Sequence, residues 1–364
     1  MRLKSTLWVL PVIAFLAASP GFPAEKIRTL RVELSAGALP HFAVENLVGA
    51  MRVTGGSSKG VVAVATVHAE SDELAQAVTF EQVTGKTGVS TLRVRYPLDQ
   101  ENVLRYPGRD KGSHVLGAFF GGSNTNADYD GHRVKISESR GVLLYADVEV
   151  QVPRHLEDAT FRNLVGTLEG RDLEGTLRFE ATSGDIATSR VGGEVRADTG
   201  SGDVTGNELK GSFTCDTGSG DCELTGFRGE TLDCNVGSGD VMIRKATARR
   251  VDVVTGSGDV KVIEGDVQEF HADTGSGTVH LENPGARLAT VKADTGSGDV
   301  VLRLSPATSF EALADQGSGE IIMGFKDAQA IVRHKEVIGY RRGDARLKID
   351  VDTGSGDLTI EPGA

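Results

Sequence analysis

The sequence predicts an all-β protein, most of which is a parallel β-solenoid, similar to a single-stranded β-helix, of about ten coils. One observation is a motif, D-T-G-S-G-D-V at 198–204, that recurs in steps of 18 to 21 residues, with one double step of 37. The other is that apolar residues stand six and four positions before the central serine and three after it, with mostly polar residues between them. Each repeat is therefore expected to be two half-buried strands joined by a tight turn. The central serines are Ser183, Ser201, Ser219, Ser238, Ser257, Ser276, Ser297, Ser318 and Ser355.

The Gly-Ser-Gly centre of each repeat predicts the corner of a coil. Glycine adopts positive φ values without steric cost, so two glycines allow a sharp turn. When coils stack, each strand pairs with its equivalents above and below, and like side chains form ladders inside. Val241 is then expected to point inward and Met242 outward.

Residues 1–24 have the features of a secretory signal peptide. A basic start, Met1-Arg2-Leu3-Lys4, precedes an apolar run over 7–18 and small residues up to Ala24. The run is short for a membrane span, which needs roughly 20 residues, so a retained anchor is the weaker alternative. The protein is expected to be exported to the periplasm, the cell surface or the medium, with no membrane span after cleavage.

Residues 25–160 are expected to form an irregular β-rich N-terminal region. Alternating segments at 29–34, 61–67, 90–96, 132–136 and 144–152 predict strands, and 72–77 predicts a helical turn or a loop. The long Gly- and Asn-rich segment 106–131 is expected to be a mobile loop or a binding loop.

Two segments of this half resemble each other. E-N-L-V-G-A-M at 45–51 is similar to R-N-L-V-G-T-L at 162–168, so both predict degenerate coils.

The regular solenoid is expected over 161–364. Between Ser318 and Ser355 one turn is lost or replaced by an insertion, and 325–348 predicts a hairpin or an elongated coil. This insertion holds a basic cluster, which is either a solvated face or a docking patch for an acidic partner or an envelope polymer. The Arg342-Gly343-Asp344 tripeptide is interpreted as a chance match to a cell-attachment signal. The cluster comprises Arg333, His334, Lys335, Arg341, Arg342, Arg346 and Lys348.

Composition narrows the possible partners. The net charge of −12 argues against nucleic acid and against an anionic membrane surface. The 47 glycines fall at turn positions, so they indicate turns and not disorder.

The three cysteines leave two alternatives. Cys215 and Cys234 share an inward column of consecutive coils, so they are either core thiols or a Cys215–Cys234 disulfide. Cys222 takes a valine position and is interpreted as a small hydrophobic residue.

Two acidic columns flank the turn, three residues before and two residues after the marker serine. Their repulsion has to be offset, either by hydrogen bonds from turn N–H groups or by bound cations. The motif departs from the Gly/Asp calcium-binding repeat where the ligands would lie, so we expect capping and no metal. The metal alternative rests on Asp203, Asp221, Asp240 and Asp259. The first column holds Glu180, Asp198, Asp216, Asp273, Asp294, Asp315 and Asp352, and the second Asp185, Asp203, Asp221, Asp240, Asp259, Asp299, Glu320 and Asp357.

No catalytic residue and no cofactor is predicted. His271 and His280 are expected on the outer face of two strands, with Lys261 one coil from His280. The sequence contains no triad, zinc or phosphate-loop pattern, and the outward residues vary from coil to coil.

The D-T-G-S-G-D-V coils, with V-Q-V-P-R at 150–154 before them, resemble the bacterial "putative adhesin" family of β-strand repeats, a family of domains of unknown function related to toast-rack and GIN-domain proteins. The resemblance covers 140–364 well and 46–53 weakly. It implies a non-enzymatic, exported β-solenoid that acts as a structural or adhesive surface in the cell envelope, with an envelope protein or polysaccharide as partner. A periplasmic partner- or ligand-sensing module of an envelope-stress system is the second hypothesis. An enzyme acting on polysaccharide is the third.

Overall fold

The computed structural model describes residues 25–35, 41–84, 89–107 and 124–363. The predicted signal peptide, 1–24, and most of the predicted loop, 108–123, lie outside the described residues. The chain is nearly all β, with 69% of residues in strands and 2% in helix, and the predicted parallel β-solenoid is confirmed. It forms two compact units, one of residues up to 193 with 198–202, and one of 194–197 with 203 onward. No helix of the described residues is long and apolar enough to cross a membrane.

The first unit opens with an antiparallel sheet. β3 (Met51–Ala69) pairs with β1 (Lys26–Ser35) on one side and with β9 (Val142–Pro153) on the other. Alternate residues of β3 are buried from Val61 to Ala69, as the sequence pattern predicts for a half-buried strand. The segment after β3 is α1 (Asp72–Ala77), whose N-cap is Ser71 because its hydroxyl accepts a hydrogen bond from the Leu74 N–H.

The predicted strands of 25–160 are all present. The structure adds a strand, β7, inside the segment predicted as a loop, and β7 forms an antiparallel hairpin with β8. The remaining strands of this region are β4 (Thr79–Thr84), β5 (Ser90–Arg95), β6 (Val103–Arg105), β7 (Thr125–Tyr129) and β8 (His132–Ser137).

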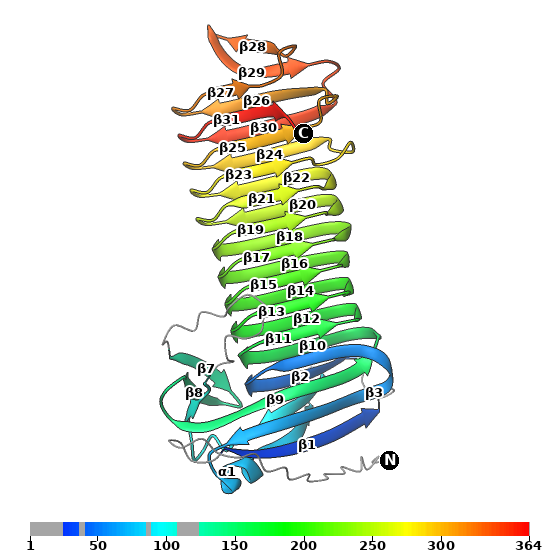
Figure 1. Cartoon of the computed structure of the whole chain (residues 1–364), viewed down its shortest axis with the longest axis vertical. Coiled ribbons are helices and arrows are strands. Elements are labelled where there is room, and N and C mark those ends of the chain that lie inside the picture. Colours follow the sequence, from blue (N-terminus) through cyan, green and yellow to red (C-terminus); the bar gives the residue numbers. More distant parts are fainter. Residues whose placement is uncertain (1–24, 36–40, 85–88, 108–123, 364) are drawn as a thin grey trace. The chain divides into compact units, whose positions relative to one another are not determined.

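The two similar segments form adjacent coils. β2 (His41–Val48) pairs in parallel with β10 (His155–Val165), which places Asn46 directly beside Asn163, 117 residues later in the chain. Both asparagines are fully buried, and the Asn46 Nδ2 donates to the Asn163 Oδ1 at 2.9 Å. The antiparallel β-rich region is therefore an excursion between two neighbouring coils of one stack (Figure 1).

Each regular coil has a longer strand in one sheet and a shorter strand in the facing sheet. Equivalent strands pair in parallel and in register, as with Val241↔Val260 in the short-strand sheet. Val241 is fully buried whereas Met242 is only partly buried, because the two side chains point to opposite faces. The long strands are β12 (Glu174–Ser183), β14 (Gly192–Ser201), β16 (Lys210–Ser219), β18 (Arg228–Ser238), β20 (Thr247–Thr255), β22 (Asp266–Thr274) and β24 (Thr290–Thr295). The short strands are β11 (Leu168–Arg171), β13 (Ile186–Ser189), β15 (Val204–Asn207), β17 (Cys222–Thr225), β19 (Val241–Arg244), β21 (Val260–Ile263), β23 (Val279–Glu282) and β25 (Val300–Leu304).

The last two coils of the second unit do not follow chain order. β30 (Leu347–Thr353) pairs with β24 on one side and with β26 (Phe310–Gln316) on the other. β31 (Leu358–Pro362) lies in the same way between β25 and β27 (Ile321–Met323). The coil formed later in the chain thus lies between two earlier coils (Figure 1).

The predicted insertion is a hairpin. β28 (Gln329–Arg333) and β29 (Glu336–Arg342) pair antiparallel, and β29 continues the sheet beside β26.

The predicted positive φ occurs in the earlier turns, at Gly184, Gly202 and Gly220. The turn glycines of the second unit from Gly239 onward are not in that region. A Cβ at Gly258 would instead overlap the carbonyl oxygen of Gly239 in the neighbouring coil, so these glycines are required by the close approach of stacked turns. The left-handed corner lies seven residues after the marker serine. The residue type at this position varies from coil to coil, and only one of the six residues below is glycine. It is formed by Arg190, Glu208, Gly226, Lys245, Glu264 and Asn283.

Both alternatives predicted for Cys215 were wrong, and so was the interpretation of Cys222 as a small hydrophobic residue. Cys215 forms a disulfide with Cys222, and Cys234 is a free, buried thiol. Cys215 and Cys234 are register partners, so their side chains point in parallel, whereas Cys222 faces Cys215 from the opposite sheet of the same coil. The Cα atoms of Cys215 and Cys222 are 6.9 Å apart, and the Cys234 sulfur is 3.8 Å from that of Cys222.

Candidate binding surface

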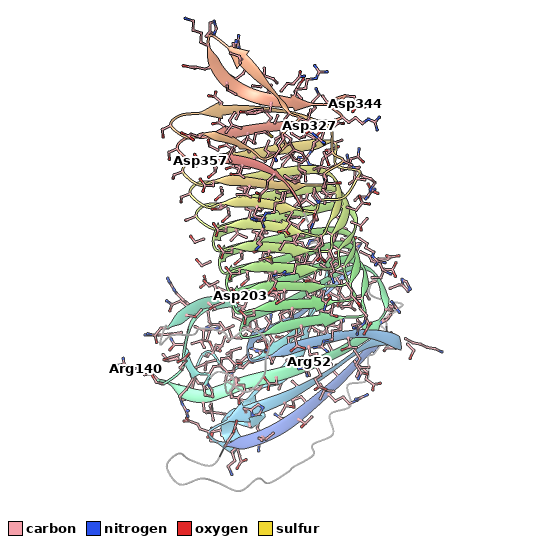
Figure 2. All side chains as sticks on the ribbon, turned by 45° about the horizontal axis from the view of Figure 1, so that its top comes forward. Arg52, Arg140, Asp203, Asp327, Asp344 and Asp357 are labelled. Atoms are coloured by element: carbon pink, nitrogen blue, oxygen red, sulfur yellow. A yellow bond between two sulfur atoms is a disulfide. The ribbon has the colours of Figure 1, made fainter. Side chains whose placement is uncertain are left out.

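The turn edge of the second unit carries the acidic column two residues after each marker serine. Each aspartate of this column in the second unit accepts a hydrogen bond from a backbone N–H of the neighbouring coil. The Asp221 N–H donates to Asp203 at 2.9 Å, and the Asp240 and Asp259 N–H groups donate to Asp221 and Asp240 at 2.8 Å. The Thr278 N–H donates to Asp259 at 2.8 Å. The column is therefore a hydrogen-bonded ladder between coils, and Asp203 and Asp357 lie on its edge in Figure 2.

Buried threonines reinforce the same turns. The hydroxyl of Thr255 accepts a hydrogen bond from the Gly258 N–H in its own turn and donates one to the Gly239 carbonyl of the neighbouring coil. Thr274 repeats both bonds, with Gly277 and Gly258. Each turn is thus hydrogen-bonded to the neighbouring turn by a threonine hydroxyl before the glycines and by an aspartate carboxylate after them.

The four carboxylates of the metal alternative do not converge. Asp203, Asp221, Asp240 and Asp259 point along the stack to N–H groups. In the described ranges, no three His, Cys, Asp or Glu side chains gather as a metal site.

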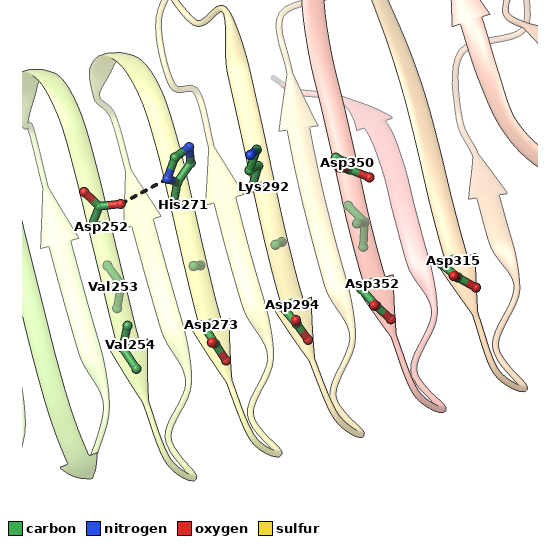
Figure 3. Close-up of a pocket in the computed structure, with 13 residues that line it drawn as sticks. Asp252, Val253, Val254, His271, Asp273, Lys292, Asp294, Asp315, Asp350 and Asp352 are labelled. Atoms are coloured by element: carbon green, nitrogen blue, oxygen red, sulfur yellow. Dashed lines mark ion pairs between the residues drawn. The ribbon is translucent and has the colours of Figure 1, made fainter.

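The other acidic column lies on an open face of the long-strand sheet. Asp273, Asp294, Asp352 and Asp315 are register neighbours on β22, β24, β30 and β26, and all four are exposed. Figure 3 shows them as a row across successive strands. Among the described residues, none of the four has an ion pair or hydrogen-bond partner, although neighbouring strands are only roughly 4.8 Å apart.

This row forms one side of a groove of about 480 Å³. A second row of side chains runs parallel to it, two residues earlier on each strand, and contains Asp252, His271, Lys292 and Asp350 (Figure 3). His271 is held by an ion pair of 3.1 Å between its Nδ1 and the Asp252 carboxylate. The floor and ends of the groove are completed by Val253, Val254, Ala272, Ala293 and Val351.

The second row continues to Asp233, the register partner of Asp252. Burial, together with the neighbouring Asp252 charge, raises the pKa of the Asp233 carboxyl above its usual range. The Asp233 carboxyl at this end of the row is therefore protonated more readily than an exposed aspartate.

The equivalent acidic position in the first unit is compensated. Glu45 accepts hydrogen bonds from Arg93 at 2.9 Å and from Arg162 at 3.1 Å, and Arg162 also donates to Glu180 at 2.6 Å. The charges alternate along β5, β2, β10 and β12, so Glu45 and Arg162 each lie between two opposite charges.

His280 and the Arg342-Gly343-Asp344 tripeptide, which the sequence also singled out, are paired. His280 lies 3.3 Å from Glu282 and is the register partner of Lys261. In the tripeptide, Arg342 pairs with Asp327 at 2.8 Å and lies over the Phe325 ring, while Asp344 pairs with Arg346 at 2.6 Å. These contacts hold the terminal coil and leave neither side chain of the tripeptide free.

The sequence shows both acidic columns but does not by itself separate them by environment. The available signal was position: residues two after the serine belong to the turn, whereas residues three before it are the last outward positions of the long strand. The sequence could not show that Asp352 lies beside Asp294, since this depends on the exchanged order of the last coils.

Comparison with known proteins gives the following matches. Residues 148–361, more than half of the chain, match the family described as Toastrack DUF4097. No curated protein matches.

Three solved structures are similar at low identity. A "putative cell adhesion protein" from Clostridium sporogenes is 10% identical, with 93% of this chain and 100% of that chain covered and a TM-score of 0.21. A "putative lipid binding protein" from Parabacteroides distasonis is 11% identical, with coverage of 92% and 96% and a TM-score of 0.39. A "putative adhesin" from Bacteroides fragilis is 10% identical, with coverage of 93% and 99% and a TM-score of 0.31. On the match over 148–361, this chain belongs to the Toastrack DUF4097 family.

Proposed function

We propose that this chain is a non-enzymatic, exported protein that acts as an interaction surface in the bacterial cell envelope. The observation that carries the proposal is the groove on the long-strand sheet, where two rows of outward side chains repeat once per coil. The leader-like 1–24 segment supports the location.

The shape of the groove favours an elongated ligand. It crosses β20, β22, β24, β30 and β26, so equivalent side chains recur at the strand spacing, roughly 4.8 Å, along the stack. A polymer or extended chain that lies along the groove meets the same kind of side chain at each step, and many weak contacts then add up.

The chemistry of the groove favours hydrogen-bond donors. Four carboxylates without protein partners accept hydrogen bonds from amino, hydroxyl or amide groups, and charge-assisted bonds are stronger than neutral ones. Lys292 supplies a positive group on the opposite row. An envelope polysaccharide that carries amino groups, or an extended basic protein segment, matches both rows.

The proposal is tested by binding of a defined probe, a glucosamine oligomer of four to six units, to the full chain by isothermal titration calorimetry. Replacing Asp294 and Asp352 together with Asn removes two carboxylates from the centre of the row, and we expect affinity to fall at least fivefold. Asp221→Asn with Asp240→Asn is the matched control, because it makes the same charge change on the turn edge, outside the groove. The proposal is wrong if the wild-type chain does not bind the probe, or if the two double variants lose the same affinity. Unchanged length of the oligomer after incubation, checked by mass spectrometry, separates binding from catalysis.

A further inference from the structure

The second unit ends in an apolar and basic protrusion. Five large hydrophobic side chains are exposed in the described residues, and four of them, Leu313, Ile322, Val332 and Val337, belong to β26, β27 and the β28–β29 hairpin. Val332 is 60% exposed and Val337 43%, and they are register partners across the hairpin. Because register partners point to the same face, the two valines form one apolar pair.

The hairpin extends past the sheet that supports it. β29 pairs with β26 only through 339–342, so the tip half, 332–338, has no further strand beside it (Figure 1). The tip is a two-residue turn, His334-Lys335, with φ values of 51° and 74°. Such a turn keeps the two strands close together, so the apolar pair lies on a narrow, convex projection.

The tip of the hairpin is basic, whereas the chain as a whole is acidic. Arg333, His334 and Lys335 are exposed, and within the described residues none of them has a carboxylate partner. Glu336 is the one acidic residue beside them. The other basic residues of the cluster are neutralised: Arg341 and Lys348 lie near Glu311, and Arg342 and Arg346 pair with Asp327 and Asp344.

Edge charges alone have an ordinary explanation, since lysine and arginine on an edge strand prevent edge-to-edge pairing. That explanation does not account for Val332 and Val337, because an exposed aliphatic pair promotes association.

We propose that the β28–β29 tip, residues 332–337, docks on an anionic lipid bilayer surface. Aliphatic side chains enter the boundary between headgroups and acyl chains while Arg and Lys reach the phosphates. A convex tip suits a flat, deformable surface, whereas a protein partner of the same size would have to offer a groove.

The negative charge of the whole chain, −12, does not oppose this contact strongly. Charges farther from the bilayer than the Debye length, about 8 Å at physiological ionic strength, are largely screened, so the local charge of the projecting tip decides. The inference rests on the proposed envelope location but not on the groove.

The test is co-sedimentation of the full chain with vesicles of phosphatidylglycerol and phosphatidylcholine in equal parts. Each basic residue near an anionic surface contributes on the order of fivefold in partition, so Arg333→Gln with Lys335→Gln should lower it roughly 30-fold. Val332→Ser with Val337→Ser should lower it about tenfold by removing the apolar contact. Val254→Ser is the control in the vesicle assay only, because Val254 is also exposed, at 48%, but lies in the groove and not on the tip. The 1–24 segment is the same in all variants, so differences between them report on the tip alone.

Binding that falls in both double variants and in 0.5 M salt, with unchanged melting temperatures, supports the inference. It is overturned if the wild-type chain does not sediment, if the double variants sediment like wild type, or if pure phosphatidylcholine vesicles bind equally well. It is also overturned if the valine variant instead abolishes self-association in solution, since the occupant is then a second copy. Glucosamine-oligomer binding measured on the same variants keeps the two proposals apart, because the tip variants should leave it unchanged.

Discussion

Two columns of aspartates run through the coils of the second unit, and the fold treats them differently. On the turn edge, each carboxylate accepts an N–H from the neighbouring coil, so like charges stack while their oxygens are satisfied. On the open sheet face, Asp273, Asp294, Asp352 and Asp315 stack at the same spacing with no such donor among the described residues. The first column therefore stabilises the coil stack, whereas the second costs stability and is available to a ligand.

The largest effect is expected where two stacked turns touch. Gly258→Ala would place a methyl group on the carbonyl oxygen of Gly239, so the two coils have to separate and the ladder bonds beside them lengthen. We expect a loss of roughly 3 kcal/mol or more in the free energy of unfolding, measured by urea denaturation. Gly265→Ala is the control, because a Cβ there would lie 3.2 Å from its nearest neighbours. Equal losses at both positions would show that turn contact is not what selects the glycine.

Removing the acceptors of the ladder should cost less. Asp240→Ala with Asp259→Ala leaves the N–H groups of residue 259 and Thr278 without their partners. A hydrogen bond to a charged group contributes roughly 1.5–3 kcal/mol, and less when exposed, so we expect a combined loss of about 2 kcal/mol in urea denaturation. A stabilised double variant would contradict the ladder's role.

The open column should respond with the opposite sign. Asp294→Asn with Asp352→Asn removes every neighbouring charge pair in the row of four, and each such pair costs on the order of 1 kcal/mol in water. Exposed side chains turn apart and solvent screens them, so each of the three pairs contributes only part of that. We expect stability to rise by about 1 kcal/mol at low salt and the gain to shrink in 0.5 M salt. Glu45→Gln, at the equivalent position of the first unit, is the control and should destabilise, since Glu45 lies between two arginines.

A smaller, pH-dependent effect is expected at Asp233. Its pKa is raised by burial and by Asp252, so between its ordinary and its raised pKa the folded state binds more protons than the unfolded state. Stability from this group therefore falls as the pH rises through that window. Asp233→Asn should stabilise the protein at pH 7, and its advantage should disappear near pH 3.5, below the ordinary Asp pKa. Urea denaturation at the two pH values measures this, and an advantage that is constant with pH would contradict it.

No effect is expected from calcium. Because the turn carboxylates already accept N–H groups, chelator should leave the melting temperature unchanged, and millimolar Ca²⁺ should act like Mg²⁺ through screening. A bound ion at a hundred times its dissociation constant would add about 2.7 kcal/mol per site. A Ca²⁺-selective shift that Asp240→Asn with Asp259→Asn abolishes would turn the ladder into a metal site.

The repeat predicted the coil because its signal is local and redundant. Val241 and Met242 show this well. Adjacent residues of a strand point to opposite faces, so Val241 is buried and Met242 is only partly buried. The similarity of 45–51 to 162–168 predicted two coils, but their direct pairing across 117 residues has no local signal.

Other features depended on the facing sheet or on chain order. The Cys215–Cys222 disulfide joins two sheets, whereas a column alignment compares residues only within one sheet. The order of side chains along the groove depends on β30 lying beside β24, and nothing in the spacing of the serines indicates which of the two coils is the outer one.

The exchanged order of the last coils has a consequence for how the chain resists fraying. Repeat proteins usually loosen from the outermost repeat, which is held on one side only. Here the segment 347–362 is held on both sides, by β24 and β25 and by β26 and β27. The outermost coil is a loop whose two ends both return into the stack, so separating residues 347–362 from their neighbours would break strand pairing on two sides at once.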